Sequence, residues 1–161
     1  MQKSPAGRVG DTASMSDDTC QICQKHRGAG PLKGMLVAVQ DGFWVYHAPG
    51  DDSGRAALGY LFIESDRHVP YLADLTDEEA AALGRIRSRL AAGLRDAIDT
   101  ELVLAAVVGR GVAHFHEHLF VRHRGTAADV PWHASDEAAP RADEGQVAEL
   151  VNGLRIALTR E

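Results

Sequence analysis

The stretch Ala-His-Phe-His-Glu-His-Leu-Phe at residues 113–120 carries a histidine at every second position, at His114, His116 and His118. Successive side chains of a β-strand point to opposite faces of its sheet, so an extended chain here puts all three imidazoles on one face. Neighbouring imidazolium ions repel each other, and we therefore expect at least one neutral ring, which can act as a nucleophile or a metal ligand. The alternative for so short a motif is a surface cluster of histidines without chemistry.

The rest of the chain supplies partners for this strand. β-Prone runs separated by turn signals predict further strands, with a hairpin turn at Asp41-Gly42 and a loop over residues 49–54. The predicted strands are residues 35–39, 43–48, 58–64, 102–108 and 113–122.

Helical periodicity follows the first three strands. Residues 75–79, Leu-Thr-Asp-Glu-Glu, form a capping-box signature with Thr76 at the cap. Apolar residues then recur at helical spacing: Leu83, Ile86, Leu90, Leu94 and Ile98. A second amphipathic pattern, near the C-terminus, comprises Val147, Leu150, Val151, Leu154, Ala157 and Leu158. We therefore predict an α+β fold, an antiparallel sheet of about five strands with one main central helix and a C-terminal helix.

Length and composition fit one ordinary core. The chain has 161 residues, of which 45% are hydrophobic, and we expect a single domain over residues 19–161 after a flexible tail over residues 1–18. The net charge is -6 and there is no dense run of Lys and Arg, which argues against a nucleic-acid partner. No apolar stretch reaches the roughly 18 residues that would span a bilayer. We therefore expect a cytoplasmic protein without a membrane partner.

Cys20 and Cys23 are the two cysteines of the chain, and they are separated by two residues. Thiolates at this spacing are good metal ligands, and a tetrahedral zinc site commonly adds two imidazoles. The histidines that can complete it are His26, His47, His68 and His114. The alternative is a free or redox-active pair of thiols.

Taken together, these motifs resemble the histidine triad (HIT) superfamily of nucleotide hydrolases and transferases. Residues 114–120 are similar to its signature of three alternating histidines, and residues 20–23 to the Cys-x-x-Cys of its zinc-containing members. Residues 64–69, followed by the helix start at 75–79, look like the family's strand end, basic-His turn and helix start. The resemblance covers about residues 20 to 124, in the family's order.

The resemblance implies a function for each histidine. His116 would attack the α-phosphorus of a purine nucleotide or nucleoside phosphoramidate and form a covalent nucleotidyl-histidine, while His118 would hydrogen-bond the phosphate oxygens or the leaving group. A structural zinc ion would be held by ligands that resemble those of zinc-containing members, namely Cys20, Cys23, His68 and His114. Family members are commonly homodimers that pair through the helix and the sheet edge, so we also expect a homodimer.

Some positions depart from the family pattern. Many members carry a polar pair such as Gln-Ser just before the triad, where this chain has Arg110-Gly111. Arg110 can clamp a phosphate and Gly111 can offer its backbone N–H, while Arg122 can add positive charge or form a solvated strand end. Glu117 occupies a usually apolar slot, and a carboxylate on the core side needs a partner or an exposed sheet edge.

These departures keep other functions open. The first alternative is a non-catalytic, zinc-stabilised nucleotide-binding or interaction domain of the same fold. The second is a metal-dependent hydrolase with all three triad histidines on one ion, which the spacing disfavours because alternate strand residues lie about 6.5–7 Å apart.

Overall fold

The computed structural model describes residues 18–109 and 111–160, so the expected tail over residues 1–18 lies outside the described residues except for Asp18. The main sheet is antiparallel and has the strand order β1-β2-β4-β6-β5. Its strands are β1 (Met35–Gln40), β2 (Phe43–His47), β4 (Leu61–Ser65), β5 (Thr100–Ala106) and β6 (His116–His123). The helices are α1 (Gln21–His26), α2 (Asp77–Ala97) and α3 (Glu144–Leu158). The smaller elements are a strand pair, β3 (Ala56–Ala57) with β7 (Arg141–Ala142), and the 3-10 turns Leu72–Asp74 and Trp132–Ala134.

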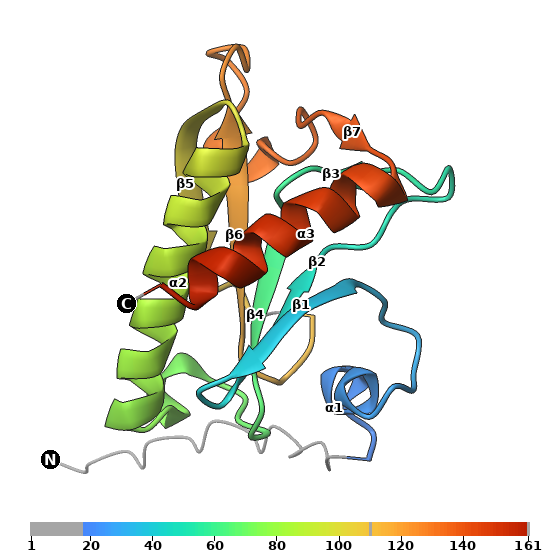
Figure 1. Cartoon of the computed structure of the whole chain (residues 1–161). Coiled ribbons are helices and arrows are strands. Elements are labelled where there is room, and N and C mark those ends of the chain that lie inside the picture. The colour runs from blue at the N-terminus through green and yellow to red at the C-terminus, as the bar shows by residue number, and fades with distance from the viewer. Residues whose placement is uncertain (1–17, 110, 161) are drawn as a thin grey trace, which may run out of the picture.

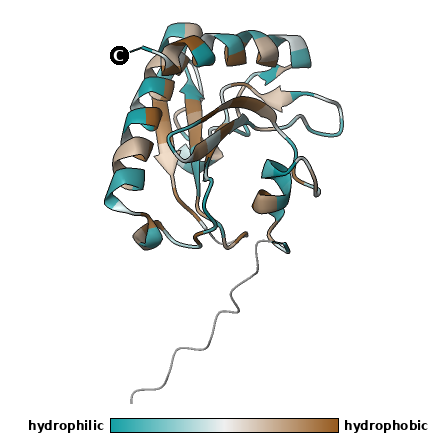
Figure 2. Ribbon diagram, turned by 60° about the horizontal axis from the view of Figure 1, so that its bottom comes forward, coloured by the Kyte–Doolittle hydropathy of each residue, from teal (hydrophilic) through white to brown (hydrophobic). Residues whose placement is uncertain are grey.

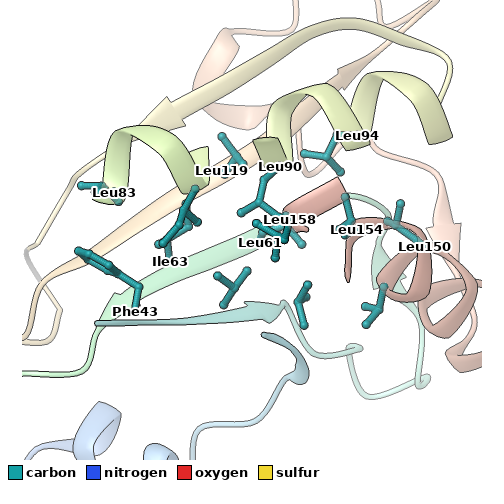
Figure 3. Packing of buried hydrophobic residues seen from close by; sticks show 14 of the residues in the cluster. Phe43, Leu61, Ile63, Leu83, Leu90, Leu94, Leu119, Leu150, Leu154 and Leu158 are labelled. Carbon is teal, nitrogen blue, oxygen red and sulfur yellow. The ribbon is translucent and has the colours of Figure 1, made fainter. Parts of the chain in front are cut away.

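The hydrophobic core lies between one face of the sheet and helices α2 and α3 (Figure 1). Figure 3 shows leucines of both helices directed toward Phe43, Leu61 and Ile63, which point inward from the neighbouring strands β2 and β4. All three of these strand residues are fully buried. Along the helices, hydrophilic and hydrophobic residues alternate as expected for elements with one buried face (Figure 2). None of the described helices is long and apolar enough to cross a membrane.

The structure confirms both helices that periodicity predicts. Helix α2 begins after Thr76, whose hydroxyl accepts from the Glu79 N–H while the Glu79 carboxylate accepts from the Thr76 N–H. This reciprocal pair satisfies two backbone donors that a helix start leaves unpaired. The buried residues of α3 are the six that the apolar pattern singles out.

Strand boundaries differ from the prediction where the backbone turns. The hairpin at Asp41 and Gly42 is confirmed, with φ of 50° and 80° at these residues. The strand expected over residues 58–64 begins only at Leu61, because Gly59 has φ 83° and interrupts the extended chain. The strand expected over residues 102–108 spans Thr100–Ala106 instead, where it pairs with β6.

Candidate functional site

Strand β6 separates its side chains between two environments. His116 and His118 share the face away from α2 and α3, with ring centroids 5.2 Å apart, whereas Glu117 and Leu119 point into the core and are buried. The prediction that His114 joins them on the strand is wrong, because β6 begins at His116 and His114 lies in the bend before it. The bend directs His114 toward the cysteines instead.

His116 has a fixed orientation at the wall of a pocket. Its Nδ1 lies 2.7 Å from the carbonyl oxygen of His114, and because a carbonyl only accepts, Nδ1 must carry the proton. The lone pair of a neutral His116 therefore resides on Nε2. The pocket has a volume of about 400 Å³, within the roughly 300–1,000 Å³ range of small-molecule sites. Its apolar walls are Ile22, Pro31, Leu32, Pro49, Phe62 and Val112.

His118, next to His116, is partly buried. Its Nδ1 lies 2.7 Å from the hydroxyl oxygen of Tyr60, and its ring packs edge-on against Phe62. Burial, and then repulsion between the imidazolium forms of the two neighbouring rings, lowers the pKa of His118, which favours the neutral form of this ring. The two neighbouring imidazoles thus have different hydrogen-bond partners and different environments.

A buried charged cluster forms another wall of the same pocket. Glu64 is the cross-strand partner of His116, and its carboxylate lies 2.5 Å from Lys25 Nζ and 3.0 Å from His26 Nε2. The ammonium of Lys25 also lies 4.1 Å from the centroid of the Tyr46 ring. Helix α1 therefore covers part of the sheet face that carries His116. Sequence reasoning missed this cluster, although a lone carboxylate ending the apolar run of β4 was a visible signal.

Four metal-ligating side chains meet beside the histidine strand: Cys20, Cys23, His68 and His114. Their ligand atoms all lie within 4.8 Å of one another, and His114 Nδ1 is 3.4 Å from each cysteine sulfur. A tetrahedral ion with bonds of about 2.3 Å to sulfur and 2.0 Å to nitrogen separates such atoms by about 3.5 Å. The cluster can therefore hold a metal ion, and no other such group occurs within residues 18–109 and 111–160.

The surroundings of His114 favour the neutral tautomer that can bind a metal ion through Nδ1. Its Nε2 lies 2.7 Å from the carbonyl oxygen of Ser65 at the end of β4, so Nε2 carries the proton and Nδ1 presents its lone pair to the cysteines. Burial lowers the pKa of His114, which keeps the ring in the neutral form that binds metals. The same contact ties the bend before β6 to the turn that carries His68.

The other two histidines that could have joined the cysteines are engaged elsewhere. His26 stacks on Trp44 with ring centroids 4.6 Å apart and contacts Glu64. His47 is fully buried in β2. Its Nδ1 donates to the Ala48 carbonyl and its Nε2 accepts from the Gly59 N–H, so it joins a strand to the irregular segment before β4.

The structure describes two of the three expected substrate-binding residues, Gly111 and Arg122. Arg110 lies outside the described residues, and Gly111 is exposed in the bend before β6. Arg122 lies on the same face of β6 as His116 but farther along the strand. At about 3.3 Å per residue, the two Cα atoms are about 20 Å apart. Its guanidinium donates to the carbonyls of Ala127 and Val130, at 2.8 and 3.0 Å. Arg122 thus holds the loop that follows β6.

Glu117 has a partner on the helix that covers it. Arg87 of α2 donates from Nε and Nη2 to the two carboxylate oxygens of Glu117, both at 2.5 Å. This two-pronged ion pair explains how a carboxylate occupies a usually apolar position, because both of its oxygens are satisfied. It also joins α2 to the strand that carries His116.

No protein-family model matches the chain, and no curated protein matches it in sequence. In structure it is similar to a zinc-bound histidine triad family protein from Mycobacterium smegmatis, with a TM-score of 0.63, 19% identity, and coverage of 89% of this chain and 95% of that chain. A Hit-like protein involved in cell-cycle regulation from Bartonella henselae gives a TM-score of 0.64, 14% identity, and coverage of 87% and 96%.

A third similar structure is a hypothetical histidine triad nucleotide-binding protein from Sulfolobus tokodaii, with a TM-score of 0.59, 16% identity, and coverage of 83% of this chain and 87% of that chain. The similarity extends over most of each chain and includes the five-stranded antiparallel sheet. We conclude that this chain has the histidine triad fold.

Proposed function

We propose that the protein is a nucleotide hydrolase or nucleotidyl transferase of the histidine triad type, acting at the α-phosphate of its substrate through His116. The observation that carries this proposal is the hydrogen bond from His116 Nδ1 to the His114 carbonyl, at 2.7 Å, in a side chain that lines a pocket of about 400 Å³. It leaves the Nε2 lone pair available, which is the state that a nucleophilic imidazole requires.

The proposed reaction has two displacements at phosphorus. In the first, His116 Nε2 bonds to the α-phosphorus, the bond from phosphorus to the leaving oxygen or nitrogen breaks, and the leaving group takes a proton. In the second, water or another acceptor attacks phosphorus, loses a proton, and the phosphorus–nitrogen bond breaks with its electron pair returning to Nε2. His118 lies beside His116 on the same sheet face, and we propose that it hydrogen-bonds the phosphoryl oxygens as charge develops on them.

The pocket and the fold support a proposal for the substrate class. We propose a purine nucleotide or a nucleoside phosphoramidate, with the base between the apolar walls formed by residues such as Ile22 and Phe62. The Sulfolobus tokodaii protein of the same fold is described as nucleotide-binding, which supports this class. Gly111 can still offer its backbone N–H to a phosphate, and Arg110 its guanidinium, whereas Arg122 is assigned a structural role.

We further propose that the Cys20, Cys23, His68 and His114 cluster holds a structural zinc ion. Two thiolates and two imidazoles are a donor set that zinc prefers, and four protein ligands leave no open position for substrate. The Mycobacterium smegmatis protein of the same fold is zinc-bound, which supports the assignment. Paired thiolates of this kind persist in reducing compartments, so we assign the protein to the cytoplasm.

We also propose a homodimer that pairs through the edge of the sheet. Strand β5 is a terminal strand of the sheet, and Leu102 on it is 51% exposed. An apolar edge strand with unpaired backbone groups favours association with a second chain. Sedimentation should give the mass of two chains, and Leu102→Glu should shift it toward one.

The decisive experiment is the release of AMP from adenosine phosphoramidate and from diadenosine polyphosphates. Wild type should release AMP, and the His116→Ala variant should release none above background. Equal AMP release by both proteins, or none by either, contradicts the hydrolase proposal. AMP binding by calorimetry without turnover would instead select the non-catalytic nucleotide-binding domain.

A further inference from the structure

Tyr60 contacts the ring of His118 through its hydroxyl group. The Tyr60 hydroxyl oxygen lies 2.7 Å from His118 Nδ1. Its own ring packs between Phe62 and Phe120, with centroids at 5.3 and 5.7 Å, and its carbonyl accepts from the Ala48 N–H at 2.8 Å. Both the phenol ring and the backbone of Tyr60 are therefore held in place, so the contact with His118 is fixed by packing.

The direction of this hydrogen bond decides where His118 carries its proton. Burial, reinforced by the negative charge of Asp136, raises the pKa of Tyr60 to about 12, so the hydroxyl keeps its proton at neutral pH. Within the described part of the chain, His118 Nδ1 is the hydrogen-bond partner found for that hydroxyl. A neutral imidazole has one donor and one acceptor nitrogen. If the phenol donates to Nδ1, the proton of His118 must reside on Nε2.

We propose that Tyr60 is a positioning residue that fixes His118 as the Nε2–H tautomer, opposite to the tautomer of His116. His116 Nδ1 faces a carbonyl oxygen, which only accepts, so that ring keeps a lone pair on Nε2. His118 Nδ1 faces a phenol, which can donate as well as accept, and with the phenol as the donor that ring keeps its proton on Nε2. Two adjacent imidazoles on one sheet face are thereby differentiated into a nucleophile and a hydrogen-bond donor.

The Nε2–H of His118 matters because it would contact the phosphoryl group of the substrate, and this step rests on the proposed function. The unesterified oxygens of a phosphoryl group accept hydrogen bonds and donate none. His118 with Nε2–H stabilises them, whereas the other tautomer would direct a lone pair at them. Removing the Tyr60 hydroxyl lets His118 exchange between tautomers and reduces the fraction that can assist the reaction.

The tautomers can be read directly by nitrogen NMR. Wild-type protein labelled with ¹⁵N-histidine and loaded with zinc is studied at neutral pH, and the His116→Ala and His118→Gln variants assign the two rings. In wild type, His118 should show an unprotonated Nδ1 and a protonated Nε2, and His116 the reverse. In Tyr60→Phe, the two His118 nitrogens should shift toward values averaged between tautomers, with His116 unchanged.

Kinetics add a second readout. Tyr60→Phe should lower kcat for AMP release about tenfold, equivalent to the loss of one transition-state hydrogen bond, while KM changes less than about twofold. The matched control is Tyr71→Phe, because Tyr71 is an exposed tyrosine outside the pocket. It should leave both the spectrum and kcat at wild-type values.

A protonated Nδ1 on His118 in wild type overturns the inference, and so does a Tyr60→Phe spectrum identical to wild type. The wild-type spectrum alone decides the tautomer, whatever the stability of the variant. The expected spectra without any AMP release would uphold the role of Tyr60 and overturn the proposed function. AMP release by a wild type whose His118 is protonated on Nδ1 would uphold the proposed function and overturn the role of Tyr60.

Discussion

Replacing Arg87 by methionine tests how the core tolerates the carboxylate of Glu117. The Glu117 side chain is 2% exposed, whereas that of Arg87 is 40% exposed. The arginine thus closes over the carboxylate from the solvent side, and Arg87→Met removes the charge while keeping much of the aliphatic stem.

The expected loss is large because it leaves a buried charge without its partner. Breaking a buried ion pair from one side costs about 3–5 kcal/mol, whereas an exposed pair contributes at most about 1 kcal/mol. Since Arg87 is partly exposed, water can approach the carboxylate in the variant, and we expect about 3 kcal/mol, the lower end of that range. The double variant Arg87→Met/Glu117→Leu removes both charges and should recover to within about 1 kcal/mol of wild type.

Urea unfolding followed by circular dichroism measures these differences as shifts in midpoint at constant slope. Arg85→Met is the matched control, because Arg85 lies on the same helix but is exposed, and it should change stability by less than about 0.5 kcal/mol. The reasoning fails if Arg87→Met loses less than about 1 kcal/mol, the ceiling for a surface pair. It fails equally if the double variant is no more stable than the single one.

The remaining predictions concern the metal, pH and backbone. Purified protein should contain one zinc ion per chain by elemental analysis. Cys23→Ser or a strong chelator should remove the zinc and lower the melting temperature. Metal-free protein of unchanged stability would contradict a structural role for the zinc. Burial lowers the pKa of His47 in the folded state, so the unfolded chain binds the proton first as pH falls. The contribution of neutral His47 to stability is therefore fully present above the unfolded pKa of about 6.5 and is lost as pH drops through the folded pKa. His47→Gln should flatten this loss in urea unfolding between pH 7 and 5, by up to about 1.4 kcal/mol per pH unit. Gly59→Ala, whose Cβ would lie 2.8 Å from Ile98 Cδ1, should destabilise by about 1–3 kcal/mol more than Gly42→Ala, which meets nothing within 4 Å, and equal losses would refute the crowding at Gly59.

Local signals in the sequence account for most of the secondary structure. The capping box at Thr76 and the leucine spacing define α2 because they act within a few residues. Likewise, the Asp41-Gly42 turn defines the first hairpin. The sequence carries no comparable signal for α1, a six-residue helix without a side-chain cap, which is positioned by contacts of Lys25 and His26 with distant strands.

The candidate site was predictable in its residue types but not in its contacts. The four metal-ligating residues and His116 follow from motifs, yet the place of His114 before the strand depends on the end of β4 and the turn after it. The partner of Glu117 lies 30 residues away in the sequence, and the pairing requires the docking of α2 on the sheet. Long-range register of this kind is not encoded in any short window.

The pleat of β6 separates two properties of the protein along one strand. Odd-numbered positions, such as Glu117 and Leu119, contact the core, so substitutions there should alter unfolding and leave turnover per folded molecule intact. His116 and His118, whose side chains lie on the other face, should behave in the opposite way. A one-residue deletion inside the strand would carry every later side chain across the sheet and exchange imidazole for carboxylate. Deletions in this strand should therefore abolish folding and chemistry together, even where each single substitution affects only one of them.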